Sequence, residues 1–305
     1  MAAVGGTPVG MGGDECTRLL ARAAGHRLAD RELRWILEDV AADPDLATSA
    51  EARTEAFDRL VARRAAGEPL QYVLGRWPFR SVELTVDRRV LIPRPETERV
   101  VEVALEALAA GPGEPLPGAT GAVCVDLGTG SGAIALSLAV EAGPSRPGLE
   151  VWATDDSDAA LEVATANLGT SAAAVRAAGA RVHMAAGSWF DALPDHLAGR
   201  VDLVVSNPPY VAVSELVGLD PEVRLWEPIG ALVAPDGAGG VGGMADVEAI
   251  VAGAPRWLRS GGALVVEIAP HQADAAVDAA GLAGLTGARV APDLAGRPRA
   301  LVARR

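Results

Sequence analysis

Lysine is missing from this sequence: all 27 basic residues are arginine, against 40 acidic residues, and the net charge is −13. A protein that holds DNA or RNA through its phosphates usually carries a basic surface. The acidic balance therefore argues against direct nucleic-acid binding, although a local basic patch would escape this argument. Aromatic residues are also scarce, at 4%, while apolar residues make up half of the chain, as in a globular protein.

Cysteines, long apolar runs and metal-ligand clusters are scarce or missing as well. Cys16 and Cys124 lie far apart, and two cysteines do not form a disulfide framework. No apolar run reaches the length of a membrane helix, and the start, "MAAVGGTPVGMGGDE", lacks the basic and apolar regions of a signal peptide. Four scattered histidines predict no metal site. We expect a cytoplasmic protein without a membrane partner, and a disordered leader over residues 1–13.

The first part of the chain predicts a small helical domain over residues 14–75. Leu33, Ile36 and Val40 recur at helical spacing, and Thr48 with Glu51 predicts a capping box at the start of a further helix. The charges of this domain indicate a solvated surface first, and a face that docks a substrate or partner second.

A connecting segment follows over residues 76–110. Within it, "FRSVELTVDRRVLI" alternates apolar and polar residues and predicts a hairpin that turns at residues 87–89. Residues 111–121, "GPGEPLPGATG", predict a loop by their glycine and proline content.

The last part, residues 111–305, alternates short apolar strands with helical stretches. The predicted strands are "AVCVDLG", "EVWATD", "ARVHMAAG", "VDLVVSN" and "ALVVEIA", and the tail "ARVAPDLAGRPRALVARR" could add two more. This order is typical of an α/β domain with a parallel sheet and helices on both faces, a Rossmann-like fold.

A glycine-rich turn follows the first of these strands in "VDLGTGSGAIALSLA". Gly128, Gly130 and Gly132 permit unusual backbone angles, and the following helix offers free N–H groups. Asp155 ends the next strand, where an acid can accept hydrogen bonds from ribose hydroxyls. NAD and S-adenosylmethionine both carry such a ribose, so this pair does not separate them. A tight strand–helix turn without a ligand also stays open.

The stretch "VVSNPPYV" distinguishes the two cofactors. Prolines cannot continue a sheet, so a stiff loop must begin near Asn207. The Asn207 side-chain oxygen and the Pro208 carbonyl are two acceptors that could hold both protons of one NH₂ group. Tyr210 could pack against the planar group that carries this NH₂. A methyltransferase acting on a planar nitrogen needs such a site, whereas an NAD-dependent dehydrogenase does not.

At these residues the sequence resembles a known family. Asn-Pro-Pro-Tyr is similar to the motif of amino methyltransferases, and the chain closely resembles the release factor glutamine-N5 methyltransferases, the PrmC/HemK family. The resemblance covers roughly residues 14–305. It is carried by "EPLQYVLG", "LIPRPETE", "VDLGTGSGAIALSLA", "SWFDAL", "VVSNPPYV" and "DLAGRPR". It differs at Asp156, at Ala269 and in the glycine-rich loop 235–247.

The resemblance implies a class I methyltransferase domain behind a helical substrate-docking domain. It implies S-adenosylmethionine as methyl donor and, as substrate, the Gly-Gly-Gln glutamine of class 1 release factors. The cofactor residues it implies are Gly128, Thr129, Gly130, Ser131, Gly132, Asp155, Trp189 and Asn207. The substrate would be held by Asn207, Pro208, Pro209 and Tyr210, and catalysis would depend on Asn207, Pro208 and Tyr210. Arg94 and Glu96 look like supporting residues near the pocket mouth.

Two alternatives remain open on the sequence alone. An enzyme that methylates exocyclic amines of adenine or guanine in nucleic acid would share the Asn-Pro-Pro-Tyr loop, although the net charge argues against it. A non-catalytic module that binds release factors would not need the glycine turn, Asp155 and the loop together.

Overall fold

The computed structural model describes residues 11–112 and 121–305, which form two compact units. One unit holds the chain up to Arg76 together with Asp220–Trp226, and the other holds Trp77–Leu219 and Glu227–Arg305. Most of the predicted loop at 111–121 and the first ten residues of the predicted leader lie outside the described residues. Of the remaining leader residues, Met11 is buried and Gly13 begins the first helix.

The first unit is helical, as its apolar spacing predicts. Its helices are α1 (Gly13–Ala23), α2 (Asp30–Ala42), α3 (Ala50–Ala65) and α4 (Leu70–Leu74). Ile36 and Phe57 are fully buried in its core. The predicted capping box is wrong by one residue: Ser49, rather than Thr48, accepts the hydrogen bond from the Ala52 N–H at the start of α3. Serine is a better N-cap than threonine, and the backbone of Ser49 has the extended conformation that a cap requires.

A short helix from the distant part of the chain belongs to the helical unit. This helix, α8 (Pro221–Trp226), follows strand β7 (Val211–Ala212) and precedes strand β8 (Val233–Ala234). Glu222 of α8 pairs with Arg64 of α3 at 2.6 Å, and Arg64 also bonds to Glu32 of α2 at 2.9 Å. Helix α8 is therefore attached to α2 and α3 of the helical unit by a branched ion pair.

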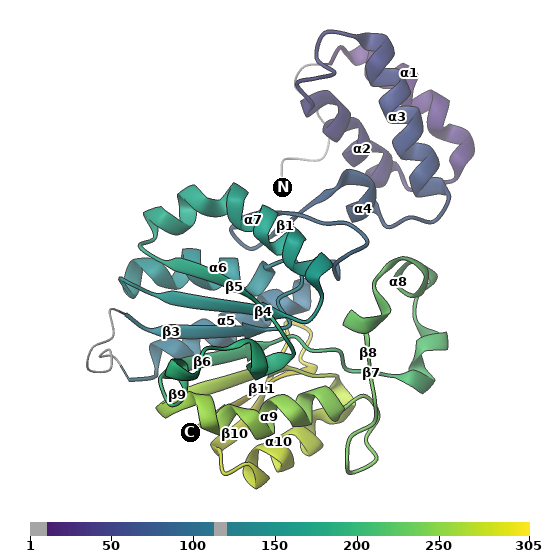
Figure 1. Cartoon of the computed structure of the whole chain (residues 1–305). Coiled ribbons are helices and arrows are strands. Elements are labelled where there is room, and N and C mark those ends of the chain that lie inside the picture. Colours follow the sequence, from purple (N-terminus) through teal and green to yellow (C-terminus); the bar gives the residue numbers. More distant parts are fainter. Residues whose placement is uncertain (1–10, 113–120) are drawn as a thin grey trace. The chain divides into compact units, whose positions relative to one another are not determined.

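The second unit is built on a seven-stranded mixed sheet with the strand order β10-β11-β9-β6-β3-β4-β5 (Figure 1). Neighbouring strands from β9 to β5 are parallel, and β11 runs antiparallel to both β9 and β10. The bounds are β3 (Val123–Leu127), β4 (Glu150–Asp155), β5 (Arg181–Ala186), β6 (Val201–Ser206), β9 (Leu258–Glu267), β10 (Thr286–Pro292) and β11 (Pro298–Arg304). The predicted parallel strands and the two tail strands are confirmed, and β6 lies beside β3 in the sheet.

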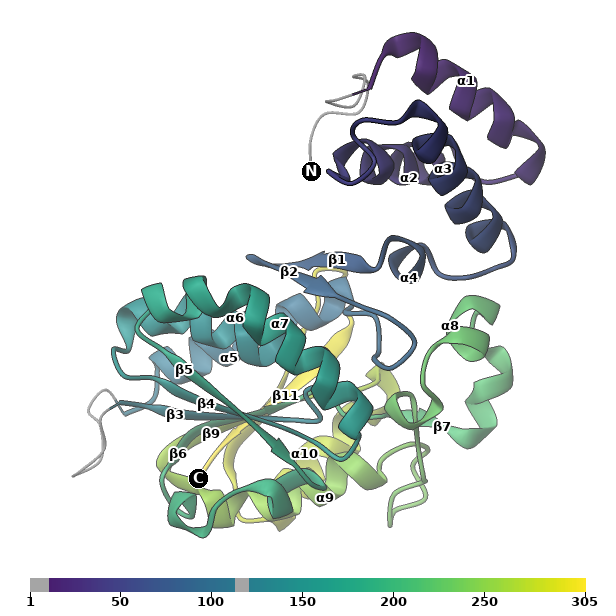
Figure 2. The ribbon, with the colours of Figure 1, turned by 45° about the horizontal axis from the view of Figure 1, so that its top comes forward.

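Helices cover both faces of this sheet, as predicted (Figure 2). On one face lie α5 (Pro95–Ala109), α6 (Ala133–Ala142) and α7 (Asp158–Ala177), and on the other lie α9 (Ala245–Trp257) and α10 (Ala273–Leu282). Strands β3 and β6 are buried along their whole length because both of their faces are covered. Within residues 11–112 and 121–305, no helix is both long and apolar enough to cross a membrane.

A hairpin forms in this region, but it lies earlier in the chain than predicted. It consists of β1 (Arg76–Phe79) and β2 (Val82–Thr85) and turns at Arg80 and Ser81. The turn predicted at residues 87–89 also forms, since the Val90 N–H donates to the Asp87 carbonyl at 3.1 Å, but it does not join the two strands of the hairpin. Arg80 adopts a left-handed conformation, with φ of 50°, and its guanidinium pairs with Glu141 of α6 at 2.6 Å. This tertiary ion pair stabilises a turn that carries no glycine or asparagine signal.

A buried asparagine joins this hairpin to the glycine turn. Asn167 of α7 accepts from the Thr85 N–H at 2.7 Å and donates to the carbonyls of Thr85 at 3.0 Å and Ser131 at 2.9 Å. One side chain therefore satisfies three backbone groups from two segments far apart in sequence.

Replacing this side chain tests its role in the fold. We expect Asn167→Ala to lower the free energy of unfolding by about 3 kcal/mol, because buried backbone groups lose their partners. The measurement is urea unfolding. Thr165→Ala, an exposed change on the same helix, should shift stability by less than about 0.5 kcal/mol. A loss for Asn167→Ala no larger than that of the control would contradict this role.

Candidate active site

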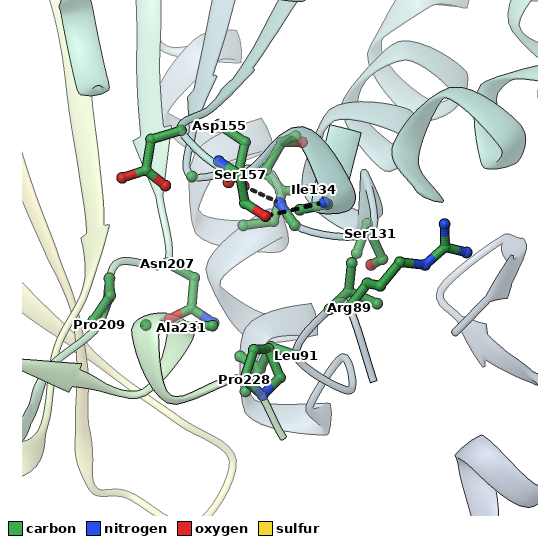
Figure 3. Close-up of a pocket in the computed structure, with 18 of the residues that line it drawn as sticks. Arg89, Leu91, Ser131, Ile134, Asp155, Ser157, Asn207, Pro209, Pro228 and Ala231 are labelled. Carbon is green, nitrogen blue, oxygen red and sulfur yellow. Dashed lines mark hydrogen bonds between the residues drawn. The ribbon is translucent and has the colours of Figure 1, made fainter. Parts of the chain in front are cut away.

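A cavity of about 470 Å³ opens at the carboxyl ends of β3, β4 and β6. Ligands of open α/β sheets bind at this edge. Figure 3 shows Asp155 and Ser157 on one side of the cavity and Asn207 and Pro209 on another. The cavity brings together most of the predicted site residues: Gly128, Thr129, Gly130, Ser131, Asp155, Trp189, Asn207 and Pro209. Gly132, Pro208 and Tyr210 are not among the described residues that line it.

The glycine turn lies between the end of β4 and Trp189. Gly128, Gly130 and Gly132 have φ of 70°, 55° and 83°, which side chains rarely adopt. A Cβ on Gly128 would lie 3.2 Å from the Trp189 ring. Trp189 itself has φ of 45°, an unfavourable conformation that persists only where its surroundings impose it. The bare backbone of the turn and the indole ring thus form one continuous wall.

The two oxygens of Asp155 bond to the backbone beside the cavity. Oδ2 accepts from the Gly130 N–H at 2.8 Å, and Oδ1 accepts from the Ser157 N–H at 3.0 Å. Burial raises the pKa of this carboxyl group, and the two backbone donors oppose that shift. Each oxygen keeps a further lone pair, so the carboxylate can hold the turn and still accept hydrogen bonds from a ligand.

A second carboxylate supports the glycine turn from inside the sheet. Oδ2 of Asp126, in β3, accepts from the Thr129 hydroxyl at 2.7 Å and from the Ala135 N–H at 3.1 Å. Oδ1 has no hydrogen-bond partner among the described residues. Complete burial raises the pKa of Asp126 to about 7. The sequence analysis did not select Asp126. An acid inside an apolar strand, directly before a glycine turn, could have indicated a side chain that supports the turn.

Asn207 emerges from β6 and is held from two sides. The preceding Ser206 donates to the Leu127 carbonyl at 2.7 Å, which ties the end of β6 to the end of β3. The Asn207 amide nitrogen donates to the Thr97 hydroxyl at 3.2 Å. Thr97 in turn donates to Glu267 at 2.8 Å, and Tyr210 donates to the other oxygen of Glu267 at 3.1 Å. The predicted loop is therefore attached to two residues that sequence reasoning missed, Thr97 and Glu267.

Arg94 has a structural partner that explains its place near the pocket. It pairs with Glu227, whose side chain is 1% exposed and also accepts from the Ile92 N–H at 3.2 Å. The residues that follow Glu227 line the cavity, namely Pro228, Gly230 and Ala231. Arg94 thus holds a wall segment in place, whereas Glu96 pairs with Arg297 at 3.1 Å and does not line the cavity among the described residues.

The glycine-rich loop 235–247 packs against the backbone of Tyr210. A Cβ on Gly243 would lie 2.2 Å from the Tyr210 carbonyl oxygen, so this approach requires glycine. The Gln272 side chain donates to both the Tyr210 carbonyl, at 3.0 Å, and the Gly242 carbonyl, at 2.9 Å. Near the end of the same loop, Asp246 lines the cavity. The loop therefore supports the Asn-Pro-Pro-Tyr segment from behind.

Comparison with known proteins identifies the family of this chain. Family models match the PrmC N-terminal domain over residues 15–75 and the Methyltransferase small domain over residues 114–218. The release factor glutamine methyltransferase of Cereibacter sphaeroides is 41% identical over 291 residues, which cover 95% of this chain and 92% of that protein. The one from Mycolicibacterium smegmatis is 43% identical over 251 residues, covering 82% and 79%. The chain belongs to the release factor glutamine methyltransferase family.

A solved structure also aligns with this methyltransferase. It is the release-factor-specific protein-(glutamine-N5) methyltransferase of Alicyclobacillus acidocaldarius, at 24% identity and a TM-score of 0.38, covering 70% of this chain and 94% of that chain. The family relationship confirms the resemblance carried by the sequence motifs, the methyltransferase class and the class I α/β fold. S-adenosylmethionine is the methyl donor of that fold class.

The cavity of the methyltransferase suits this cofactor. Its volume lies within the range of about 300–1,000 Å³ found for ligand sites. The space above Gly130 is open, because a Cβ there would meet nothing within 4 Å. Ala133 and Ile134 of the first turn of α6 line the cavity, Asp155 supplies acceptors, and Trp189 supplies a flat apolar surface. These are the features that an adenosine with an amino-acid tail requires.

Ionisation of Asp126 should appear in the stability of the methyltransferase. Its folded pKa, about 7, lies above the ordinary value of 3.8, so its contribution to stability is complete below pH 3.8 and is lost as pH rises through 7. Asp126→Asn keeps an acceptor for Thr129 and Ala135 but cannot ionise. Between pH 5 and 8 we expect the wild type to lose roughly 2–3 kcal/mol relative to this variant, measured by urea unfolding. If the free energies of unfolding of the two proteins change with pH in parallel, the pKa of Asp126 is not raised by burial.

Asp155 gives a direct test of cofactor binding. Asp155→Ala removes the acceptors and releases Gly130, so the affinity for S-adenosylmethionine should fall about 10- to 100-fold in calorimetry. Asp158→Asn, an exposed change at the start of α7, removes the same charge nearby and should leave the affinity almost unchanged. Equal affinities for wild type and Asp155→Ala would show that Asp155 does not bind the ribose.

Proposed function

We propose that this enzyme transfers a methyl group from S-adenosylmethionine to the side-chain amide nitrogen of the glutamine in the Gly-Gly-Gln motif of class 1 release factors. The main supporting observation is the orientation of Asn207, whose NH₂ group is bonded to Thr97. Its oxygen is left as an acceptor for a substrate amide. Relatives about 40% identical over most of their length carry names that state this activity.

The proposed cofactor site uses the glycine turn and its surroundings. Gly128, Thr129, Gly130, Ser131 and Gly132 would shape the turn around the cofactor, with Gly132 acting through the start of α6. Asp155 would hold the ribose hydroxyls, and Trp189 would lie against the adenine. Asn207 would lie where the methionine end meets the substrate.

The proposed chemistry depends on positioning rather than on a base. S-adenosylmethionine supplies an electrophilic methyl group when it is bound. An amide nitrogen is a poor nucleophile because its lone pair is delocalised, and acceptors that hold both of its protons favour the positive charge that develops during transfer. The Asn207 oxygen and the Pro208 carbonyl would be these acceptors. The prolines at 208 and 209 stiffen the loop, so the acceptors are already aligned before the substrate binds.

The sequence suggested that Tyr210 could pack against the planar group of the substrate, but Tyr210 is not among the described residues that line the cavity. Its hydroxyl is bonded to Glu267, so we propose that the ring supports the glutamine site and that the hydroxyl anchors the loop. Burial and the neighbouring Glu267 raise the pKa of Tyr210, which disfavours its ionised form.

The decisive assay measures tritiated methyl transfer to purified release factor. A release factor with Gln→Ala in its Gly-Gly-Gln motif should accept no label, and neither should duplex DNA or RNA. Label in nucleic acid would favour the exocyclic-amine alternative. Cofactor binding without transfer to any of these substrates would favour a non-catalytic binding module. We propose that the partner is release factor protein in the cytoplasm and that nucleic acid is not bound directly.

The role of Asn207 predicts a specific kinetic change. Asn207→Ala should lower kcat on the order of 10²- to 10³-fold, with a smaller effect on KM, because the lost contact strengthens in the transition state. Ser214→Ala, an exposed change shortly after the same loop, should retain the wild-type rate. If folded Asn207→Ala methylates release factor at the wild-type rate, the loop is only a turn.

A further inference from the structure

We propose that Thr97 and Glu267 are positioning residues that determine which end of the Asn207 amide faces the reacting nitrogen. This inference rests on the proposed function, because it concerns the acceptor that the reaction requires. Thr97 lies in the first turn of α5, inside the "IPRPETE" stretch, and Glu267 is the last residue of β9. The two residues connect to Asn207 through hydrogen bonds, and Glu267 does so only through Thr97.

The direction of these hydrogen bonds follows from counting protons. Glu267 as a carboxylate has no proton to donate, so the hydroxyl of Thr97 must donate across their 2.8 Å separation. A hydroxyl has a single proton, and Thr97 can then only accept from Asn207 at 3.2 Å. The group facing Thr97 must therefore be the Asn207 NH₂. The Asn207 oxygen is left on the opposite side of the amide plane.

The reversed amide would be unfavourable as long as this chain of bonds is intact. Turning Asn207 over would place its oxygen against the Thr97 oxygen with no proton between them. In a partly buried site, such an unsatisfied pair of acceptors disfavours the reversed state on the order of 10- to 100-fold. The reversed state would also present two donors to a substrate NH₂ group, which needs acceptors. Fixing the orientation is thus part of building the substrate site.

Glu267 can play this role because its surroundings compensate a buried charge. The residue is 1% exposed, and burial raises its pKa. Donation by Thr97 and Tyr210 and the approach of Arg299, 3.9 Å from Oε1, oppose that shift. Arg299 is itself buried and faces Asp293 at 3.6 Å. The nearby carboxylate of Glu96 raises the pKa of Glu267 further, and Glu96 itself pairs with Arg297.

The same carboxylate holds both ends of the reactive loop. Through Thr97 it orients Asn207, and its other oxygen accepts from the Tyr210 hydroxyl at 3.1 Å. The two prolines lie between these anchored residues. A single buried group therefore sets the position of the acceptor and of the aromatic ring together.

Two substitutions of Thr97 separate the hydroxyl from the shape of the side chain. Thr97→Val keeps the shape and removes the hydroxyl, and kcat should fall on the order of 10- to 100-fold while KM for release factor and the affinity for S-adenosylmethionine change little. Thr97→Ser restores the hydroxyl and should recover most of the lost rate. The assays should be run near pH 8, because a higher pH favours the carboxylate form of Glu267. A wild-type rate for Thr97→Val would overturn the proposal.

A double-mutant cycle tests whether Thr97 acts through Asn207. In the Asn207→Ala background, adding Thr97→Val should change kcat by less than about threefold, because no amide is left to orient. An equal loss in both backgrounds would mean that Thr97 acts independently, and the proposal would fail. A general structural defect caused by Thr97→Val would lower kcat equally in both backgrounds. A loss that appears only when Asn207 is present therefore excludes such a defect.

A measurement without turnover keeps this test independent of the substrate. The sequence contains only two asparagines, Asn167 and Asn207, and two glutamines, Gln71 and Gln272. The side-chain amides can therefore be assigned in an ¹H–¹⁵N spectrum by their loss in single variants. In the wild type and in Thr97→Ser, one Asn207 amide proton should be shifted downfield and protected from exchange with water. In Thr97→Val it should lose both properties.

This spectrum separates failure of the inference from failure of the proposed function. Suppose that the enzyme does not methylate release factor, but that Thr97→Val still changes the chemical shift and exchange protection of the Asn207 amide. The positioning role of Thr97 is then supported, and the proposed substrate is wrong. If the Asn207 amide is unaffected by Thr97→Val, the positioning is wrong whatever the enzyme methylates.

Discussion

A buried carboxylate at the end of β9 is the interaction on which the reactive end of this enzyme depends. Glu267 is stable in that position only because hydroxyl donors and a guanidinium surround it. Those groups come from α5, from the loop after β6 and from β11. Burying one charge therefore requires three distant parts of the chain to meet at one point. The sequence stretches that resemble the family contain those same partners, which gives a physical reason for their combination.

The cofactor side is organised by two other carboxylates. Asp126 holds the glycine turn from within the sheet, and Asp155 holds it from the end of the next strand. Ser206 then ties the end of β6 to the end of β3. The glycine turn and Asn207 are thus attached to the same pair of adjacent strands. A displacement of one would move the other, so the cofactor and substrate parts of the site share one rigid frame.

Much of this could be read from the sequence because its physical cause is local. Alternating strands and helices follow from the apolar pattern, and the end of β6 follows from two prolines that cannot continue a ladder. The hairpin was placed too late in the sequence because its turn depends on Arg80, which Glu141, sixty-one residues away, holds in a left-handed conformation. Turn propensity depends only on neighbouring residues, so it cannot indicate an ion pair with a distant residue. Thr97 and Glu267 were missed for the same reason, since each is an ordinary residue until the other is placed beside it.

The sequence by itself determined the class of fold, the loop that carries Asn207 and the acid that ends β4, because periodicity, proline and glycine act on their own neighbours. Its family motifs also indicated the reaction class, which the relatives confirm. Only the tertiary structure decided which way the Asn207 amide faces and what Arg94 and the 235–247 loop do. Each depends on contacts between residues far apart along the chain: Thr97 and Glu267 for the amide, Glu227 for Arg94, and the Tyr210 carbonyl for Gly243. Hydrogen-bond direction is set by the count of protons and acceptors in a closed space, and that space exists only once the chain has folded.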